Sequence, residues 1–175
     1  MREPITTRPA ADEYPAAVAN YVQLVPAGNL LTVLAAQVED LAALIAPLNE
    51  SDALARHAPY AWTIKQVIGH LTDCERVFGY RSLRIARNDK TPLPGFDENA
   101  YMEAVDFDRC PISELLEEFS LLRRSHQLML GQLAADAWLC TGVVNAHAMS
   151  TRAVACVMAG HAQHHLNILH KRLTG

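Results

Sequence analysis

Apolar residues recur every three or four positions in four long stretches of the chain, which is the spacing of helices that bury one face. The stretches span residues 29–48, 63–87, 111–135 and 150–173. Thr63 and Gln66 form the pattern of a capping box at the second start, and Ser150 is suited to cap the fourth. With no convincing alternating strand between them, these stretches predict an all-α four-helix bundle.

The connections between the stretches refine this architecture. Prolines at 4, 9, 15 and 26 prevent a long helix in residues 1–28, which we interpret as an N-terminal arm before a single bundle domain over 29–175. Residues 88–110 contain Pro92, Pro94 and Gly95, which break a long helix. This segment is longer than most connections in compact domains. Both features predict a long crossover between the second and third helices in place of simple up-down-up-down order.

Composition narrows the classes of function. Half of the 175 residues are hydrophobic and 19% are charged, as in an ordinary folded domain. Fifteen Lys and Arg against nineteen Asp and Glu leave a net charge of −4, without the basic face that nucleic acid binding requires. No stretch approaches the ~18 apolar residues of a membrane span, and residues 1–24 lack the pattern of a signal peptide. We therefore expect a cytoplasmic protein with no membrane or nucleic acid partner.

Two histidines of the last helical stretch are the first candidates for chemistry. His161 and His165 are four positions apart, so their rings leave the same helix face. Val154, Met158 and Ile168 continue that face, which identifies it as the inward seam of a bundle helix. An inward pair leaves four ring nitrogens in need of partners in an apolar interior, and a metal ion would satisfy one nitrogen on each ring.

A third histidine occupies the same kind of position on another helix. His70 lies on the seam that contains Val67 and Cys74, and a bundle brings such seams together across its core. Three imidazoles that leave a coordination position open are typical of a catalytic metal site. The alternative for each ring is a core histidine that is hydrogen-bonded to a carbonyl or a carboxylate.

Three further residues have roles that the pattern leaves open. His126, on the third helical seam, is either a fourth ligand or, as we favour, a core histidine. His164 is about 100° around the helix from His165, so we interpret it as a flanking residue with a lesser chance of replacing its neighbour. Cys74 is either a thiolate beside the metal or, as we favour, a small buried hydrophobic residue. The four cysteines stand singly, which indicates neither a disulfide framework nor a zinc knuckle.

Several segments in this order resemble the DinB-like (DinB/YfiT) superfamily. They are WTIKQVIGHLTD (62–73), YR (80–81), RIAR (84–87), LPGFD (93–97) and AGHAQHHL (159–166). The resemblance implies an up-down-down-up four-helix bundle in which His70, His161 and His165 bind one divalent ion, with zinc or nickel expected. It also implies substrate contacts by four residues of the second helix and the crossover, namely Tyr80, Arg81, Phe96 and Asp97.

The superfamily has a more uniform fold than chemistry, and the reaction is therefore open. Relatives include metal-dependent hydrolases and S-transferases that use a low-molecular-weight thiol as cosubstrate, and many form homodimers. We thus expect a small-molecule substrate and either hydrolysis or thiol transfer at the three-histidine centre, without assigning a catalytic residue. Gln163 stands where relatives often have an acid, which counts against hydrolysis. The alternative is a non-catalytic bundle that a metal stabilises, with a role in stress response or protein interaction.

Overall fold

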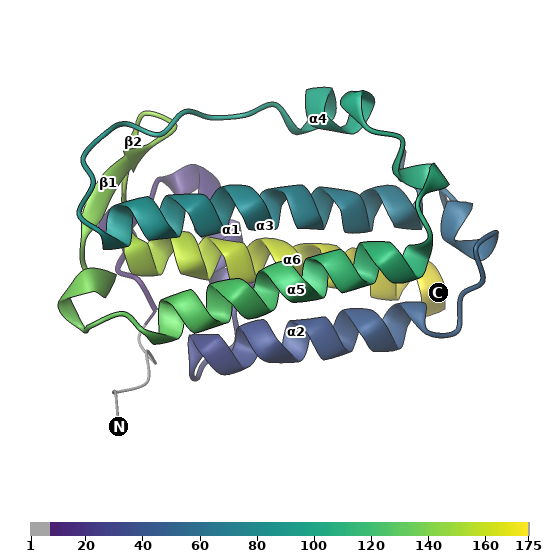
Figure 1. Cartoon of the computed structure of the whole chain (residues 1–175), viewed down its shortest axis with the longest axis horizontal. Helices are drawn as coiled ribbons and strands as arrows, with labels where there is room; N and C mark the ends of the chain where they lie inside the picture. Colours follow the sequence, from purple (N-terminus) through teal and green to yellow (C-terminus); the bar gives the residue numbers. More distant parts are fainter. Residues whose placement is uncertain (1–7, 175) are drawn as a thin grey trace.

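Four long helices form the body of the protein in the computed structural model, which describes residues 8–174. They are α2 (Leu30–Ile45), α3 (Ile64–Ala86), α5 (Ile112–Gly131) and α6 (Thr151–Thr174). Helices α2 and α6 run in one direction and α3 and α5 in the other, so the order is up-down-down-up (Figure 1). The four-helix bundle is confirmed. No helix within residues 8–174 is long and apolar enough to cross a bilayer.

The predicted crossover is present and follows the outer side of α3. It runs from the end of α3 to the opposite end of the bundle, where α5 begins, and it includes the short helix α4 (Glu98–Ala104) (Figure 1). Met102 and Phe107 anchor it by burying their side chains in the core. Near its start, the backbone of Leu93 exchanges hydrogen bonds of 2.9 Å with Val143 and Asn145. The crossover is thus fixed to the bundle at both ends.

The expectation that no strand lies between the helices is wrong at one place. Strands β1 (Thr141–Val144) and β2 (His147–Ser150) form an antiparallel hairpin before α6. The two residues of its turn, Asn145 and Ala146, have φ of 47° and 66°, the left-handed values that a two-residue type I′ turn requires. The dipeptide Asn-Gly is the usual sequence signal for such a turn. This turn could not be recognised from the sequence because its second position is alanine. The Oγ of Ser150 nevertheless caps α6, because it accepts the N–H of Ala153 at 3.1 Å.

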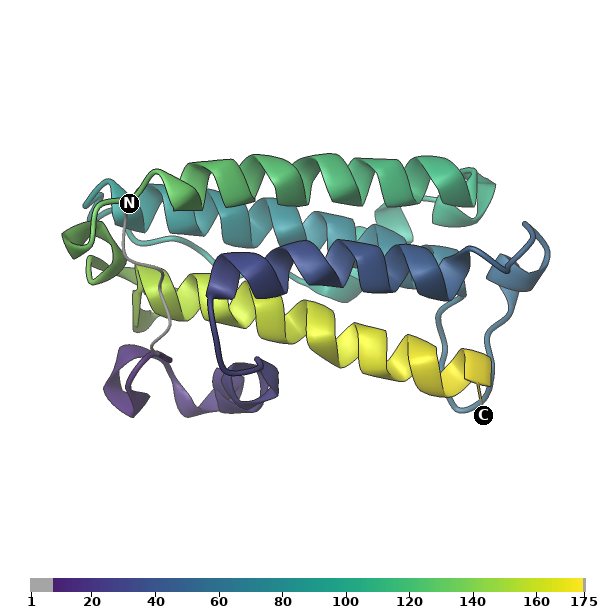
Figure 2. The same ribbon diagram turned by 90° about the horizontal axis from the view of Figure 1, so that it is seen from below.

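The described part of the N-terminal segment is folded against the last helix. It forms two 3₁₀ turns, Ala11–Glu13 and Ala16–Val18, and the short helix α1 (Ala19–Leu24), which lies beside α6 (Figure 2). Glycine at position 160 permits this close approach, since a Cβ there would lie 1.9 Å from the carbonyl oxygen of Tyr21. The contact places α1 next to His161.

Gly160→Ala should therefore destabilise the protein. Alanine favours a helix by about 1 kcal/mol, but the new methyl group would collide with backbone atoms, and overpacking of this kind costs typically about 1–3 kcal/mol. We expect urea denaturation to give a lower free energy of unfolding. Gly131→Ala is the matched control, because its Cβ would meet only Leu31 Cδ1 at 3.6 Å, an ordinary contact. Equal stability of the two variants would show that α1 is not held against Gly160.

A buried polar layer divides the apolar core into two clusters. One cluster surrounds the hairpin and the first half of α6, and the other surrounds the second half of α6 and the start of α3. Between them, Arg123 donates to both carboxylate oxygens of Glu75 at 2.9 and 2.8 Å and to Gln37 Oε1 at 2.8 Å. Gln37 Nε2 donates in turn to the carbonyl oxygen of Ala159 at 2.8 Å. This layer joins all four long helices at the level of His161.

Candidate metal centre

The three histidines of the predicted site lie together between α3 and α6. His70 comes from α3, His161 and His165 come from α6, and one ring nitrogen of each lies within 4.8 Å of the others. The Nε2 atoms of His70 and His161 are 3.1 Å apart. Two imidazoles bound to one zinc ion at about 2.0–2.1 Å in tetrahedral geometry have nitrogens about 3.3 Å apart. The first pair is thus spaced almost as two ligands of one ion would be.

Burial keeps the three rings neutral at pH 7. Desolvation lowers the pKa of His70 to about 4 and is the main cause that lowers the pKa of His165 to about 3. Desolvation and the neighbouring cationic forms of His165 and His70 also lower the pKa of His161 well below its ordinary value. Metal ligation requires the neutral imidazole. The centre therefore offers nitrogen lone pairs without first losing protons.

The hydrogen bonds of the rings support a fit to a divalent ion. In residues 8–174, His161 has no hydrogen-bond partner apart from His70, and His165 has none. Among the described residues, none of these ring nitrogens is a fully buried polar atom without a partner, so the free nitrogens remain accessible to a metal ion. Imidazole is a favoured ligand of zinc and nickel. The donor set therefore fits a divalent ion, as the sequence predicted.

Aromatic side chains surround two of the rings. Trp62 lies with its ring centroid 4.9 Å from that of His70, while Phe78 and Tyr21 contact His161 at 5.6 and 5.4 Å. Sequence reasoning did not assign these three residues to the site, since aromatic residues at helical spacing are usually core, and Tyr21 belongs to the arm. Together they restrict the positions of the His70 and His161 rings.

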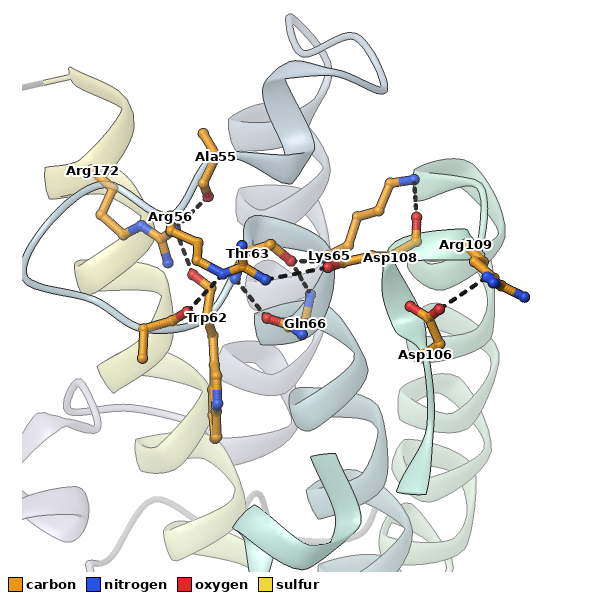
Figure 3. Close-up of polar contacts among 11 residues, drawn as sticks. Ala55, Arg56, Trp62, Thr63, Lys65, Gln66, Asp106, Asp108, Arg109 and Arg172 are labelled. Carbon is orange, nitrogen blue, oxygen red and sulfur yellow. Dashed lines mark hydrogen bonds and ion pairs between the residues drawn. The ribbon is translucent and has the colours of Figure 1, made fainter. Parts of the chain in front are cut away.

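The start of α3, which carries His70, is held by the predicted capping box. Thr63 Oγ1 accepts the N–H of Gln66 at 3.0 Å, and Gln66 Oε1 accepts the N–H of Thr63 at 2.9 Å (Figure 3). The Thr63 hydroxyl also donates to Asp108 of the crossover at 2.6 Å. Arg172 of α6 donates to the carbonyl oxygen of Trp62 at 3.0 Å. These contacts fix the helix start and Trp62 relative to α6.

The three residues whose roles the sequence left open do not belong to the trio of His70, His161 and His165. His126 Nδ1 lies 2.9 Å from Glu75 Oε1 in the polar layer, which is the core position that we favoured. The ring of His164 packs 5.1 Å from that of His165 and 5.7 Å from that of Tyr21. Cys74 Sγ is 3.6 Å from His70 Nε2, and burial raises its thiol pKa to about 12. Cys74 is thus a protonated thiol beside the centre.

The four expected substrate contacts do not share one location. Arg81 and Phe96 line a cavity of about 190 Å³. The ring of Tyr80 is on the outer surface beside Arg84, whose Cζ lies 5.2 Å from its centroid. Asp97 caps α4 by accepting the N–H groups of the next helical turn at 2.9 and 3.2 Å. The structure therefore brings two of the four to a cavity and gives the other two local contacts.

Comparison with known proteins identifies the family. The chain is similar to YfiT from Bacillus subtilis, which is described as a probable metal-dependent hydrolase with an unusual four-helix bundle topology. The two structures match with a TM-score of 0.74 over 96% of this chain and 94% of YfiT, at 18% sequence identity, which shows a shared fold. No curated protein matches the sequence. The profile of the DinB superfamily matches residues 34–169, most of the bundle, and the chain therefore belongs to that superfamily.

Proposed function

We propose that this protein binds one divalent ion, zinc or nickel, through His70, His161 and His165 and hydrolyses a small-molecule substrate with it. The observation that carries the proposal is the convergence of three neutral imidazoles, of which His70 and His161 are buried and His165 is partly buried. An ion with three protein ligands keeps a position open, as in catalytic sites. When bound, it would supply Lewis acidity and an activated water.

The protein's own contribution is to hold and shield the ligands. The polar layer fixes α6 at Ala159, two residues before His161, and the capping box fixes the start of α3. Trp62 and Phe78 cover the rings on the side of α3, and Tyr21 covers them from α1. Desolvation raises the pKa of the Tyr21 phenol, which therefore stays protonated beside His161. Such rigid support is what a site needs to keep one productive geometry.

Transfer of a low-molecular-weight thiol is the second candidate reaction, and Gln163 favours it. Its side-chain amide donates to Asn167 at 3.0 Å and accepts from Gln37 at 3.3 Å. An amide cannot take a proton from water as a general base would, whereas a metal-bound thiolate needs no base once formed. The thiol would come from a cosubstrate, because Cys74 is a buried side chain that does not belong to the three-histidine cluster.

Metal content and activity test both reactions. We expect about one ion per chain by inductively coupled plasma mass spectrometry in untagged protein purified without added metal. The loaded protein should then cleave an activated ester, or accelerate the reaction of a small thiol with a bimane electrophile, at a rate that chelation abolishes. Absence of an ion even after exposure to zinc and nickel would favour the non-catalytic bundle instead. A bound ion with neither activity would contradict the catalytic proposal alone.

The matched variants are His165→Ala and His170→Ala. Both change a histidine of α6, but His170 is exposed and lies outside the trio. Activity lost in the first and kept in the second would tie the reaction to the centre. We also propose the homodimer that the resemblance implies and the cytoplasmic location expected from the sequence composition, and light scattering after size-exclusion chromatography tests the dimer.

A further inference from the structure

Arg81 of α3 is a buried cation without a carboxylate partner. The residue is 7% exposed, its Nη2 donates to the carbonyl oxygen of Pro94 at 2.8 Å, and its Cζ lies 5.7 Å from the ring centroid of Phe96. Within residues 8–174 it forms no ion pair, whereas the buried Arg123 forms a two-pronged pair with Glu75. Desolvation accordingly lowers the pKa of Arg81. Burying a charge without a counter-ion lowers the stability of the folded protein, so an unpaired arginine at position 81 calls for a functional explanation.

The side chain of Arg81 lines the cavity of about 190 Å³ between α3, α6, the hairpin and the crossover. The walls are mainly apolar, and they include the side chains of Val18, Phe78, Phe96, Met149, Val154 and Val157. Asn145 and His147 of the hairpin are polar lining residues, and both are exposed. No aspartate or glutamate is among the described lining residues. The guanidinium is thus the fixed charge of an otherwise apolar hollow.

We infer that this cavity binds a small molecule that joins a carboxylate to an apolar body about the size of a benzene ring, with Arg81 as its counter-ion. The planar fork of a guanidinium matches the two oxygens of a carboxylate. The volume suits the apolar body, because a dry cavity of about 150 Å³ in another protein is known to hold benzene. A free phosphate has the charge but nothing to place against the apolar walls.

The position of the cavity connects this ligand to the metal centre. Val157 lies one helical turn before His161 on α6, and the ring of Phe78 both lines the cavity and contacts the ring of His161. The three histidines do not line the cavity, but the ring of Phe78 forms a shared wall between a carboxylic acid held there and His161. We therefore assign small apolar carboxylates as the substrate class, and this assignment rests on the proposed function. Binding in the cavity does not depend on it.

Isothermal titration calorimetry on the chelated, metal-free protein tests the inference, since no ion can then attract the carboxylate. The probes are benzoate, its uncharged isostere benzamide, and inorganic phosphate. Benzoate should bind at least about tenfold more tightly than the other two, as expected of one charge-assisted hydrogen-bonded pair. Arg81→Met should remove this advantage and leave benzamide binding nearly unchanged. Arg87→Met, which removes an exposed arginine at the end of the same helix, should change neither.

Three results would overturn the inference: equal binding of benzoate and benzamide, tight benzoate binding by Arg81→Met, or phosphate binding as tight as that of benzoate. Should Arg81→Met fail to fold, Ala17→Phe is used instead, because Ala17 is an exposed residue that lines the cavity. The phenyl ring introduced at position 17 would fill the cavity, and the charge of Arg81 would be kept. That variant should weaken benzoate and benzamide alike, and unchanged binding would place both ligands elsewhere. Metal content is measured separately, so a cavity that fails to bind benzoate and a centre that fails to bind metal are distinct results.

Discussion

His161→Ala should abolish tight metal binding and leave a folded, helical protein. The variant removes one of three converging imidazoles, and even changes to residues that only support a ligand cost about 10–100-fold in metal affinity. We therefore expect a loss of more than about 100-fold. The fold should survive because the two apolar clusters do not depend on this ring. Replacing a buried imidazole by a methyl group also removes nitrogens that need partners.

Metal content and competition with a chromophoric chelator measure the effect, and circular dichroism checks the helical content. His170→Ala is the control, since its ring is exposed on the same helix and lies outside the trio. It should bind metal as the unchanged protein does. Stoichiometric, tightly bound metal in His161→Ala would contradict the ligand assignment. Loss of metal together with helical structure would instead show that the ring is needed for folding.

Regular periodicity made the helices predictable, and the i, i+4 spacing placed two histidines on one inward face. His70 was predictable in its seam, but its distance from His161 depends on how α3 packs against α6, which no local pattern contains. The hairpin was missed because Ala146 replaces the glycine expected in its turn. The approach of α1 was missed because Gly160 reads as an ordinary small residue until Tyr21 is seen against it.

Charged residues show a further limit of sequence reasoning. Glu75, Arg123 and Arg81 all lie on amphipathic helices, where a charge is usually a solvated surface group. In the structure the first two form a buried pair, and the third is buried without one. His126 looked as inward as His70, and only the position of Glu75 shows which partner it takes. Pairing across helices is set by tertiary packing, so these roles could not be predicted from spacing.

Arg123→Met should lower the free energy of unfolding by about 3–5 kcal/mol, the range for breaking a buried ion pair by removing one partner. Methionine fills much of the arginine volume, so the loss comes mainly from Glu75, a carboxylate that is 2% exposed and keeps only the contact with His126. Gln37 also loses the donor to its Oε1. Urea denaturation measures the change. Arg124→Met, which alters the neighbouring exposed arginine, should change stability by less than about 0.5 kcal/mol.

The double variant Glu75→Gln/Arg123→Met separates the ion pair from simple packing. If the cost of Arg123→Met is that of an uncompensated buried charge, neutralising Glu75 should recover part of it, and the two changes should be strongly non-additive. If the cost came from lost packing around the arginine, the second change would add its own penalty.

Because this layer also bonds the carbonyl of Ala159 through Gln37, the single variant should loosen α6 beside His161 and weaken metal binding as well. Full metal affinity in a strongly destabilised Arg123→Met would show that the layer supports the fold without positioning the centre.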